Sequence, residues 1–423
     1  MRNRRLVLLI AVVMTAIACA WCQGEEVQAG SLSTRGVWVS CFEFEKLGLK
    51  NKTESQFRAN ANRIFANIKA SGCNTVYFHV RSHDDAIYPS SIVKWSGYIT
   101  KSGKALRYDP LKILVSSAHK YGLKFHAWLN PYRISQKKVL NPAAASTTDR
   151  IVRQVQEIIT RYPVDGIHFD DYFYPTNEKK YNKVSKAERK KNVNAMVKKV
   201  YQTVKAKSSK LKFGISPAGD ISYCEKIGAD VKTWLSKSGY VDYIIPQIYW
   251  SDKYILSGKK TKLFTERLAA WRAINAKDVP MYIGLALYKA GYSLSDDLGW
   301  KKSSNNLAKQ IDKIRAGNTE GYVLFSYSDL YRSGAAKEIR RYLQKIGKLT
   351  LNKKKKTLRA GKKYKLRVKA TPSRIQEKVR GRSSNKKIAT VSRKGVVKAK
   401  RKGKVKIYVT YGSLKKKCII TVK

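Results

Sequence analysis

Eight short apolar segments alternate with helical patterns between residues 34 and 346, and this alternation limits the possible folds more than any other feature. Apolar runs of six or seven residues are typical of strands that are buried on both faces. A helix between two such strands returns the chain to the same end of a parallel sheet. The segments are RGVWVSC (35–41), NTVYFHV (74–80), LKFHAWL (123–129), VDGIHFD (164–170), LKFGIS (211–216), VDYIIPQ (241–247), MYIGLAL (281–287) and GYVLFSY (321–327).

Two α/β architectures fit this order, a closed barrel and an open doubly wound sheet. The count of eight strands and the lack of a glycine-rich phosphate loop favour a (β/α)8 barrel of the TIM type over residues 34–346. The predicted helices are Glu54–Ala70, Pro110–Tyr121, Ala145–Tyr162, Lys186–Lys207, Lys262–Ile274 and Asn305–Ala316.

The composition changes near Gly347. Of the 75 residues from 349 to 423, 28 are Lys or Arg, and Glu377 is the only acid. Short segments with alternating apolar and polar residues predict strands, so this part is expected to form a small all-β, Ig-like sandwich. The formal charge of the whole chain is +58. Such an excess favours a polyanionic partner, here an anionic cell-wall polymer bound by residues 349–423, although it is also a general surface trait of some exported proteins. No nucleic-acid-binding motif is visible, so nucleic acid is not expected as a partner.

The first residues predict export. Basic residues at Arg2, Arg4 and Arg5 precede an apolar run that ends at a small-residue site around Cys19. We interpret residues 1–20 as a signal peptide and residues 21–33 as a linker. Cys19 is alternatively a site of lipid attachment, so the protein is expected to be secreted or held at the cell surface. No later stretch is long and apolar enough to predict a transmembrane span in the mature protein.

Two adjacent acids follow the fourth predicted strand, in the segment GIHFDDYFYP (166–175). Catalytic groups of such barrels lie at the carboxyl ends of the strands. Because neighbours on a strand face opposite ways, Asp170 continues the inward series and is the leading catalytic candidate. Asp171 is expected to orient Asp170 or raise its pKa, or else to cap the next segment or pair with a lysine. The second catalytic carboxyl stays open among Asp171, Asp85, Asp220 and Glu43.

Aromatic, amide and basic residues follow the other predicted strands, as a sugar site requires. Aromatic faces stack on sugar rings, polar groups bind the hydroxyls, and two carboxyls flank the bond to be cleaved. The catalytic candidates are therefore Asp170, Asp171 and Asp85. The candidate substrate-binding residues are Arg81, Trp128, Asn130, Arg133, Tyr172, Asp220, Gln247, Tyr249, Trp250 and Tyr288.

Three histidines offer a different interpretation. His79, His126 and His168 each lie two residues before a candidate site residue on neighbouring strands, so a metal-dependent polysaccharide deacetylase is one alternative. None of the three is at the end of its strand, which favours packing inside the barrel. No metal and no cofactor are therefore expected. A non-catalytic binder of wall carbohydrate is the other alternative.

Several of these segments resemble the glycosyl hydrolase-like 10 family. The matching motifs are RGVWVS, VRSHDDAIYPS, YDPLKILVSSAHKYGLKFHAWLNPYRI, VDGIHFDDYFYP, FGISPAG, VDYIIPQIYW, MYIGLALYKAG and GYVLFSYSDL. The resemblance implies a TIM-type barrel in exported or lipid-anchored bacterial proteins. Some relatives cleave peptidoglycan strands that have lost their stem peptides. The residues that match the family's motifs are Arg81, Asp85, Trp128, Asn130, Arg133, Asp170, Asp171, Tyr172, Gln247 and Tyr249.

The basic C-terminal segment resembles the bacterial Ig-like group 2 domain, through LRAG (358–361), SSN (383–385), ATV (389–391) and IITV (419–422). Such domains serve as surface spacers or adhesive modules. The sequence thus predicts a secreted glycoside hydrolase that acts on a bacterial cell-wall glycan or a related polysaccharide.

Overall fold

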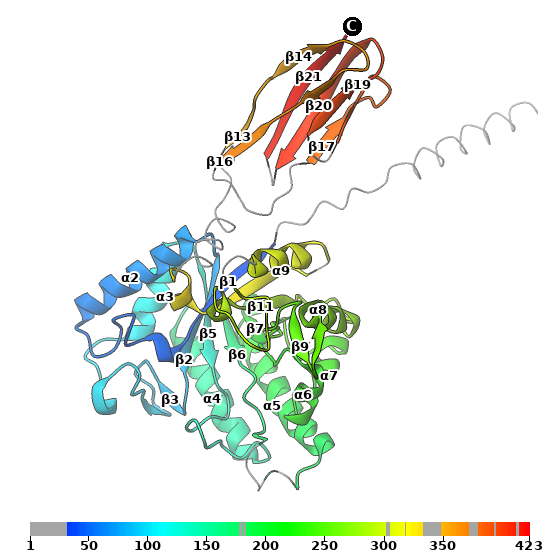
Figure 1. Cartoon of the computed structure of the whole chain (residues 1–423). Coiled ribbons are helices and arrows are strands. Elements are labelled where there is room, and N and C mark those ends of the chain that lie inside the picture. The colour runs from blue at the N-terminus through cyan, green and yellow to red at the C-terminus, as the bar shows by residue number, and fades with distance from the viewer. Residues whose placement is uncertain are drawn as a thin grey trace, which may run out of the picture. The chain divides into compact units, whose positions relative to one another are not determined.

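The computed structural model describes residues 32–176, 181, 183–301, 305–317, 319–332, 348–371, 380–392, 395–411 and 414–423 (Figure 1). The predicted signal peptide, most of the predicted linker and Cys19 lie outside the described residues. The segment 333–347 also lies outside them, so the domain boundaries at 346 and 349 stay predictions.

Eight parallel strands form one sheet, in the order β11-β12-β1-β2-β5-β6-β7-β8. Single bridges from Ile244 to Met281 and from Gln247 to Gly284 join the two edge strands, β8 and β11. The sheet therefore curls into a barrel, and the predicted TIM-type fold is confirmed. The strands are β1 (Thr34–Val39), β2 (Thr75–Arg81), β5 (Lys124–Leu129), β6 (Gly166–Phe169), β7 (Lys212–Ile215), β8 (Tyr243–Ile244), β11 (Tyr282–Ala286) and β12 (Gly321–Phe325).

Helices connect these strands and flank the sheet, as Figure 1 shows. All six predicted helices are present, as α2 (Glu54–Ala70), α3 (Pro110–Lys120), α4 (Ala145–Arg161), α5 (Lys186–Lys207), α8 (Leu263–Ala273) and α9 (Asn306–Arg315). The sequence did not predict four smaller features, α6 (Ile221–Lys226), α7 (Val231–Ser236), the β9–β10 hairpin (Tyr254–Leu256 and Lys259–Thr261) and the β3–β4 pair (Asp85–Ala86 and Lys94–Trp95). None of the described helices has the length and apolar character that crossing a membrane requires.

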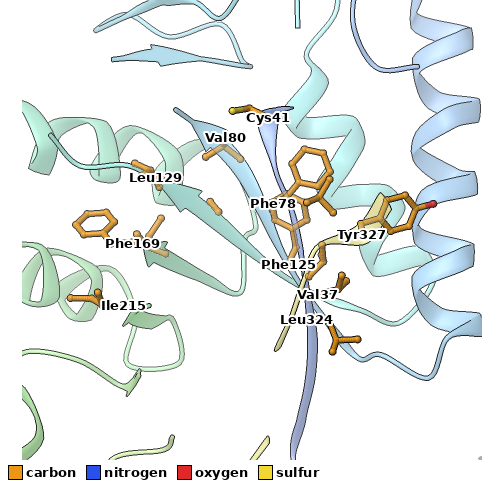
Figure 2. Packing of buried hydrophobic residues seen from close by; sticks show 14 of the residues in the cluster. Val37, Cys41, Phe78, Val80, Phe125, Leu129, Phe169, Ile215, Leu324 and Tyr327 are labelled. Carbon is orange, nitrogen blue, oxygen red and sulfur yellow. The ribbon is translucent and has the colours of Figure 1, made fainter. Parts of the chain in front are cut away.

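The main core lies between the outward faces of the strands and the helices. Phe78 and Val80 of β2 point into it together with Phe125 of β5 and Phe169 of β6, and all four are fully buried (Figure 2). Because side chains alternate along a strand, the residues between these apolar ones point into the barrel. This alternation decides which residues reach the barrel mouth.

Aromatic side chains fill the barrel interior. Trp38, Tyr77 and Tyr243 form a separate buried cluster there, with Ile245 and Val323 among its members. On the neighbouring strand β7, a Cβ added at Gly214 would lie 2.2 Å from the Tyr243 ring. Glycine at 214 therefore leaves the space that the Tyr243 ring occupies.

The C-terminal module consists of antiparallel and mixed sheets around its own core. A four-stranded sheet has the order β14-β21-β20-β17, a three-stranded sheet has the order β15-β19-β18, and β13 pairs with β16. The strands are β13 (Lys348–Leu351), β14 (Lys355–Leu358), β15 (Lys363–Lys365), β16 (Val368–Thr371), β17 (Arg380–Ser383), β18 (Ala389–Val391), β19 (Val396–Ala399), β20 (Gly403–Tyr411) and β21 (Leu414–Val422). The predicted all-β sandwich is thus confirmed.

Candidate active site

Asp170 lies directly after β6 with its carboxyl inside the barrel mouth. The residue is 3% exposed. Its Oδ1 accepts a hydrogen bond from the backbone N–H of Tyr172 at 3.1 Å, and its Oδ2 has no hydrogen-bond partner among the described residues. Burial and the neighbouring Asp171 carboxyl raise the pKa of Asp170 well above its usual value. A buried carboxyl with a raised pKa and one free oxygen is suited to donate a proton to a substrate.

Asp171 is partly buried beside Asp170. Burial raises its pKa to about 6, while Arg133 and a hydrogen bond with the Gln247 side chain act in the opposite direction. Its polar neighbours are thus Gln247 and Arg133 rather than a lysine. The two adjacent carboxyls titrate as a pair, and the raised pKa of Asp170 favours its protonated form beside the Asp171 carboxylate.

The other three candidate carboxyls are occupied by hydrogen bonds from the protein. Asp85 accepts from the backbone N–H groups of Ser82 and His83 at 3.0 and 2.9 Å, and these bonds help to lower its pKa against the effect of burial. Asp220 accepts from the first backbone N–H groups of α6, and Arg267 pairs with it. Glu43 accepts from the backbone N–H groups of Ser40 and Ser328 at 2.8 and 2.7 Å. All three carboxyls therefore fix loops of the barrel.

Arg81 and Asn130 join the ends of β2 and β5. Arg81 is fully buried, and its guanidinium donates to the Asn130 carbonyl and to Asp84 Oδ1, the latter at 3.0 Å. Asp84 in turn pairs with Arg150 of α4 at 2.9 Å. Arg81 thus positions the strand ends instead of presenting its charge to the barrel mouth.

Trp128 and Tyr172 lie closer to the open side. Trp128 stacks on His79 with 3.8 Å between ring centroids, and its Nε1 is buried and has no hydrogen-bond partner in the described part of the chain. The Arg133 guanidinium lies 3.4 Å from the Tyr172 ring centroid, and Tyr172 is 46% exposed. This exposed ring, held by a cation, provides a flat surface next to the two aspartates.

The residues after β8 and β11 form an aromatic group. Tyr249 lies 5.9 Å from Tyr288 and 6.1 Å from Phe325, measured between ring centroids. Gln247 donates to the Ser216 carbonyl at 2.8 Å, which fixes its side chain. Trp250, like Tyr249, is partly buried and packs against the core.

Sequence reasoning missed Phe325. The predicted eighth strand extended to Tyr327, but β12 ends at Phe325, and the Phe325–Ser326 peptide is cis. Phe325 is therefore the last residue of the strand and joins Tyr249 and Tyr288. The alternation of side chains along β12 is the signal that could have found it.

Five exposed aromatic residues lie on loops that follow the carboxyl ends of barrel strands. They are Phe42 after β1, Tyr172 after β6, Tyr223 after β7, and Tyr288 and Tyr292 after β11, each at least 38% exposed; a sixth, Tyr331 after β12, is 39% exposed and hydrogen-bonds to Asn67 of α2. Large exposed apolar groups on one end of a domain commonly mark a binding surface.

The three histidines lie one layer below this site. His126 Nδ1 and His168 Nδ1 contact the Tyr243 hydroxyl at 2.9 and 3.3 Å, and Trp38 Nε1 donates to His168 Nε2 at 3.1 Å. Burial lowers the pKa of His79 to about 3 and that of His126 to about 4, so both rings are neutral. The contacts of these histidines are those of packing residues, and the described residues contain no group of three potential metal ligands.

Comparison with known families agrees with this geometry. The sequence profile described as glycosyl hydrolase-like 10 matches residues 33–138 and 132–302. The chain belongs to the glycosyl hydrolase-like 10 family. A second profile, the bacterial Ig-like domain (group 2), matches residues 347–422.

Two relatives of the chain are named glycosyl hydrolases. The chain is 28% identical to "Glycosyl hydrolase DigH" of Escherichia coli K12 over 405 residues, which covers 74% of the chain and 90% of the relative. It is 28% identical to "Glycosyl hydrolase YngK" of Bacillus subtilis, covering 71% and 69%. Among solved structures, the PgaB glycoside hydrolase domain of Bordetella bronchiseptica aligns with a TM-score of 0.51 at 10% identity, covering 74% of the chain and 99% of that domain. This last likeness concerns the fold alone.

Proposed function

We propose that this protein is an exported glycoside hydrolase that cleaves glycosidic bonds in a bacterial cell-wall glycan, namely peptidoglycan strands without stem peptides. The observation that carries the proposal is the Asp170 carboxyl, which is buried, has a raised pKa and is free at Oδ2 among the described residues. An unpaired buried carboxyl lowers the stability of the fold, so a mere binding protein has no need of it. The family membership and the named relatives support the same reaction class.

In the proposed reaction Asp170 is the general acid. Its proton passes to the glycosidic oxygen as the bond to the anomeric carbon breaks, and positive charge develops on the sugar ring. Asp171 is ionised at neutral pH and lies beside Asp170, so its negative charge stabilises that ring. A water molecule then bonds to the anomeric carbon and releases a proton, which restores the protonated Asp170 and completes hydrolysis. Backbone N–H groups of a loop hold Asp85, and those at the start of α6 hold Asp220. Of the candidate second carboxyls, Asp171 alone is not held by bonds of this kind.

The substrate is proposed to be a chain rather than a small sugar. The exposed aromatic residues extend over loops from at least four strands, and aromatic rings stack on the apolar faces of successive sugars. Tyr172, next to the two aspartates, would contact the ring at the cleaved bond. The signal-like N-terminus supports export to the compartment where wall glycan is found.

The test is to incubate the full-length protein with purified glycan strands that lack stem peptides and to measure new reducing ends. Asp170→Asn should lose nearly all activity, because it removes the transferable proton with little change in shape. Asp149→Asn, an exposed aspartate on α4 paired with Lys199, is the matched control and should keep full activity. Background release from the parent protein despite binding would make it a binder of wall carbohydrate. Acetate release that a chelator abolishes would make it a deacetylase.

A further inference from the structure

The outward face of the sheet β14-β21-β20-β17 is densely basic. Val405, Ile407 and Val409 of β20 are buried in the core of the C-terminal module. Because side chains alternate along a strand, Lys404 and Lys406 point to the opposite, solvent-exposed face.

Strand register brings further cations to the same face. Tyr408 of β20 lies opposite Arg382 of β17 and opposite Lys417 of β21, and Thr410 lies opposite Lys415. On the other edge, Lys355 of β14 lies opposite Ile419, which itself pairs with Lys406. We call this surface the basic sheet face. Its exposed cations are Lys355, Arg382, Lys404, Lys406, Lys415 and Lys417.

Tyr408 is an aromatic residue among these cations. The Lys415 Nζ lies 4.7 Å from its ring centroid, and the Arg382 guanidinium carbon lies 5.6 Å from it. The ring therefore holds two of the six cations near the middle of the sheet.

No acid neutralises this charge within the described part of the module. The residues 348–371, 380–392, 395–411 and 414–423 contain no Asp or Glu. Neighbouring strands are about 4.8 Å apart and alternate residues about 7 Å apart, so the cations repel one another. A polyanion relieves this repulsion and releases the condensed counterions of both partners.

We propose that the basic sheet face binds an extended phosphodiester-linked polyol polymer of the cell wall, independently of glycan hydrolysis. Five of its six cations are lysines, whose compact ammonium groups bind phosphate as point charges, and the row of cations complements a chain with one negative charge per repeat.

Two other polyanions fit this surface less well. Among the module's residues whose side chains the structure describes, which leaves out Tyr411 and Leu414, no large hydrophobic side chain is exposed for insertion into a lipid surface. Stacking of nucleic-acid bases needs several open aromatic rings, but Tyr408 is half-buried and already contacts two cations.

The test measures binding of the full-length protein to lipid-free poly(glycerol phosphate) as a function of salt. The variant Lys404→Gln, Lys406→Gln, Lys417→Gln removes three charges from the basic sheet face. The matched control, Lys363→Gln, Lys365→Gln, Lys398→Gln, removes three charges from the outward face of the sheet β15-β19-β18. Only the variant of the basic sheet face should weaken binding strongly. The magnitude of the slope of log K against log salt should also fall by about 2 in this variant, because each of the three lost contacts contributes about 0.7.

Equal losses in both variants would mean that total charge alone governs binding and would overturn the proposal. Tighter binding to phosphatidylglycerol vesicles or to single-stranded DNA of equal charge would also overturn it. Replacing the same three lysines by arginine should retain binding, which separates loss of charge from loss of folding. Because binding is measured without turnover, the result does not depend on whether the barrel hydrolyses glycan.

Discussion

Asp171→Asn should make the stability of the barrel less sensitive to rising pH. The substitution keeps the shape of the side chain and removes its charge. A carboxyl whose pKa is higher in the folded state than in the unfolded state binds its proton more tightly when folded. It costs no stability at a pH below both values. The cost grows as the pH rises from the unfolded-state pKa to the folded-state pKa, and it is constant above.

The magnitude follows from the pKa of Asp171, which burial raises from 3.8 to about 6. Linkage then gives a cost of about 1 kcal/mol near pH 4.5 and about 3 kcal/mol near pH 8. The hydrogen bond with Gln247 changes by about 1 kcal/mol at most, and this change depends little on pH. As the pH rises from 4.5 to 8, the parent should therefore lose about 2 kcal/mol of unfolding free energy relative to the variant.

Urea unfolding followed by tryptophan fluorescence measures this difference. All eight tryptophans lie at or before residue 300, so the signal excludes the C-terminal module. Asp149→Asn is the control, because an exposed ion pair contributes under about 1 kcal/mol. The quantity to compare is the free energy of unfolding of Asp171→Asn minus that of the parent. If this difference stays constant or falls as the pH rises, the pKa of Asp171 is not raised.

Three further outcomes are expected. The rate of hydrolysis, measured by a reducing-end assay, should follow a bell-shaped pH profile. Its acid limb should lie near pH 6, where Asp171 ionises, and its alkaline limb where Asp170 loses its proton. Asp171→Asn should abolish the acid limb. Tyr172→Ala should raise KM several-fold more than it lowers kcat, whereas Tyr172→Phe should keep KM near that of the parent, because the ring over Arg133 is what contacts the sugar. Asp220→Ala should cost about 1 to 2 kcal/mol of barrel stability in urea unfolding, because it removes the N-cap of α6 and an ion pair with α8. The variant should show little change in kcat.

Local sequence patterns predicted most of the barrel. The bounds of α2 and α5 match the predicted helices residue for residue, because their periodicity is contained within each segment. The pattern failed at β8, predicted over 241–247 but paired as a strand only at Tyr243–Ile244. Pro246 has no N–H to donate, and the following residues instead form the bridge that closes the barrel.

The sequence by itself determined the direction of Asp170. Its position two residues after His168 continues the inward series of β6 just beyond the end of the strand, and this follows from the two-residue period of a strand without any knowledge of its neighbours. The strands of the C-terminal module likewise followed from short segments of alternating apolar and polar residues.

Only the tertiary structure decided which acids are free. Asp220 looks like a site residue in the sequence, but its partner Arg267 is 47 residues away on α8. Glu43 is likewise occupied by Ser328 at the far end of the barrel chain. Partners such as Arg267 and Ser328 come from segments that are distant in sequence, so a local pattern does not show whether a carboxyl is occupied or, like Asp170, unpartnered at Oδ2.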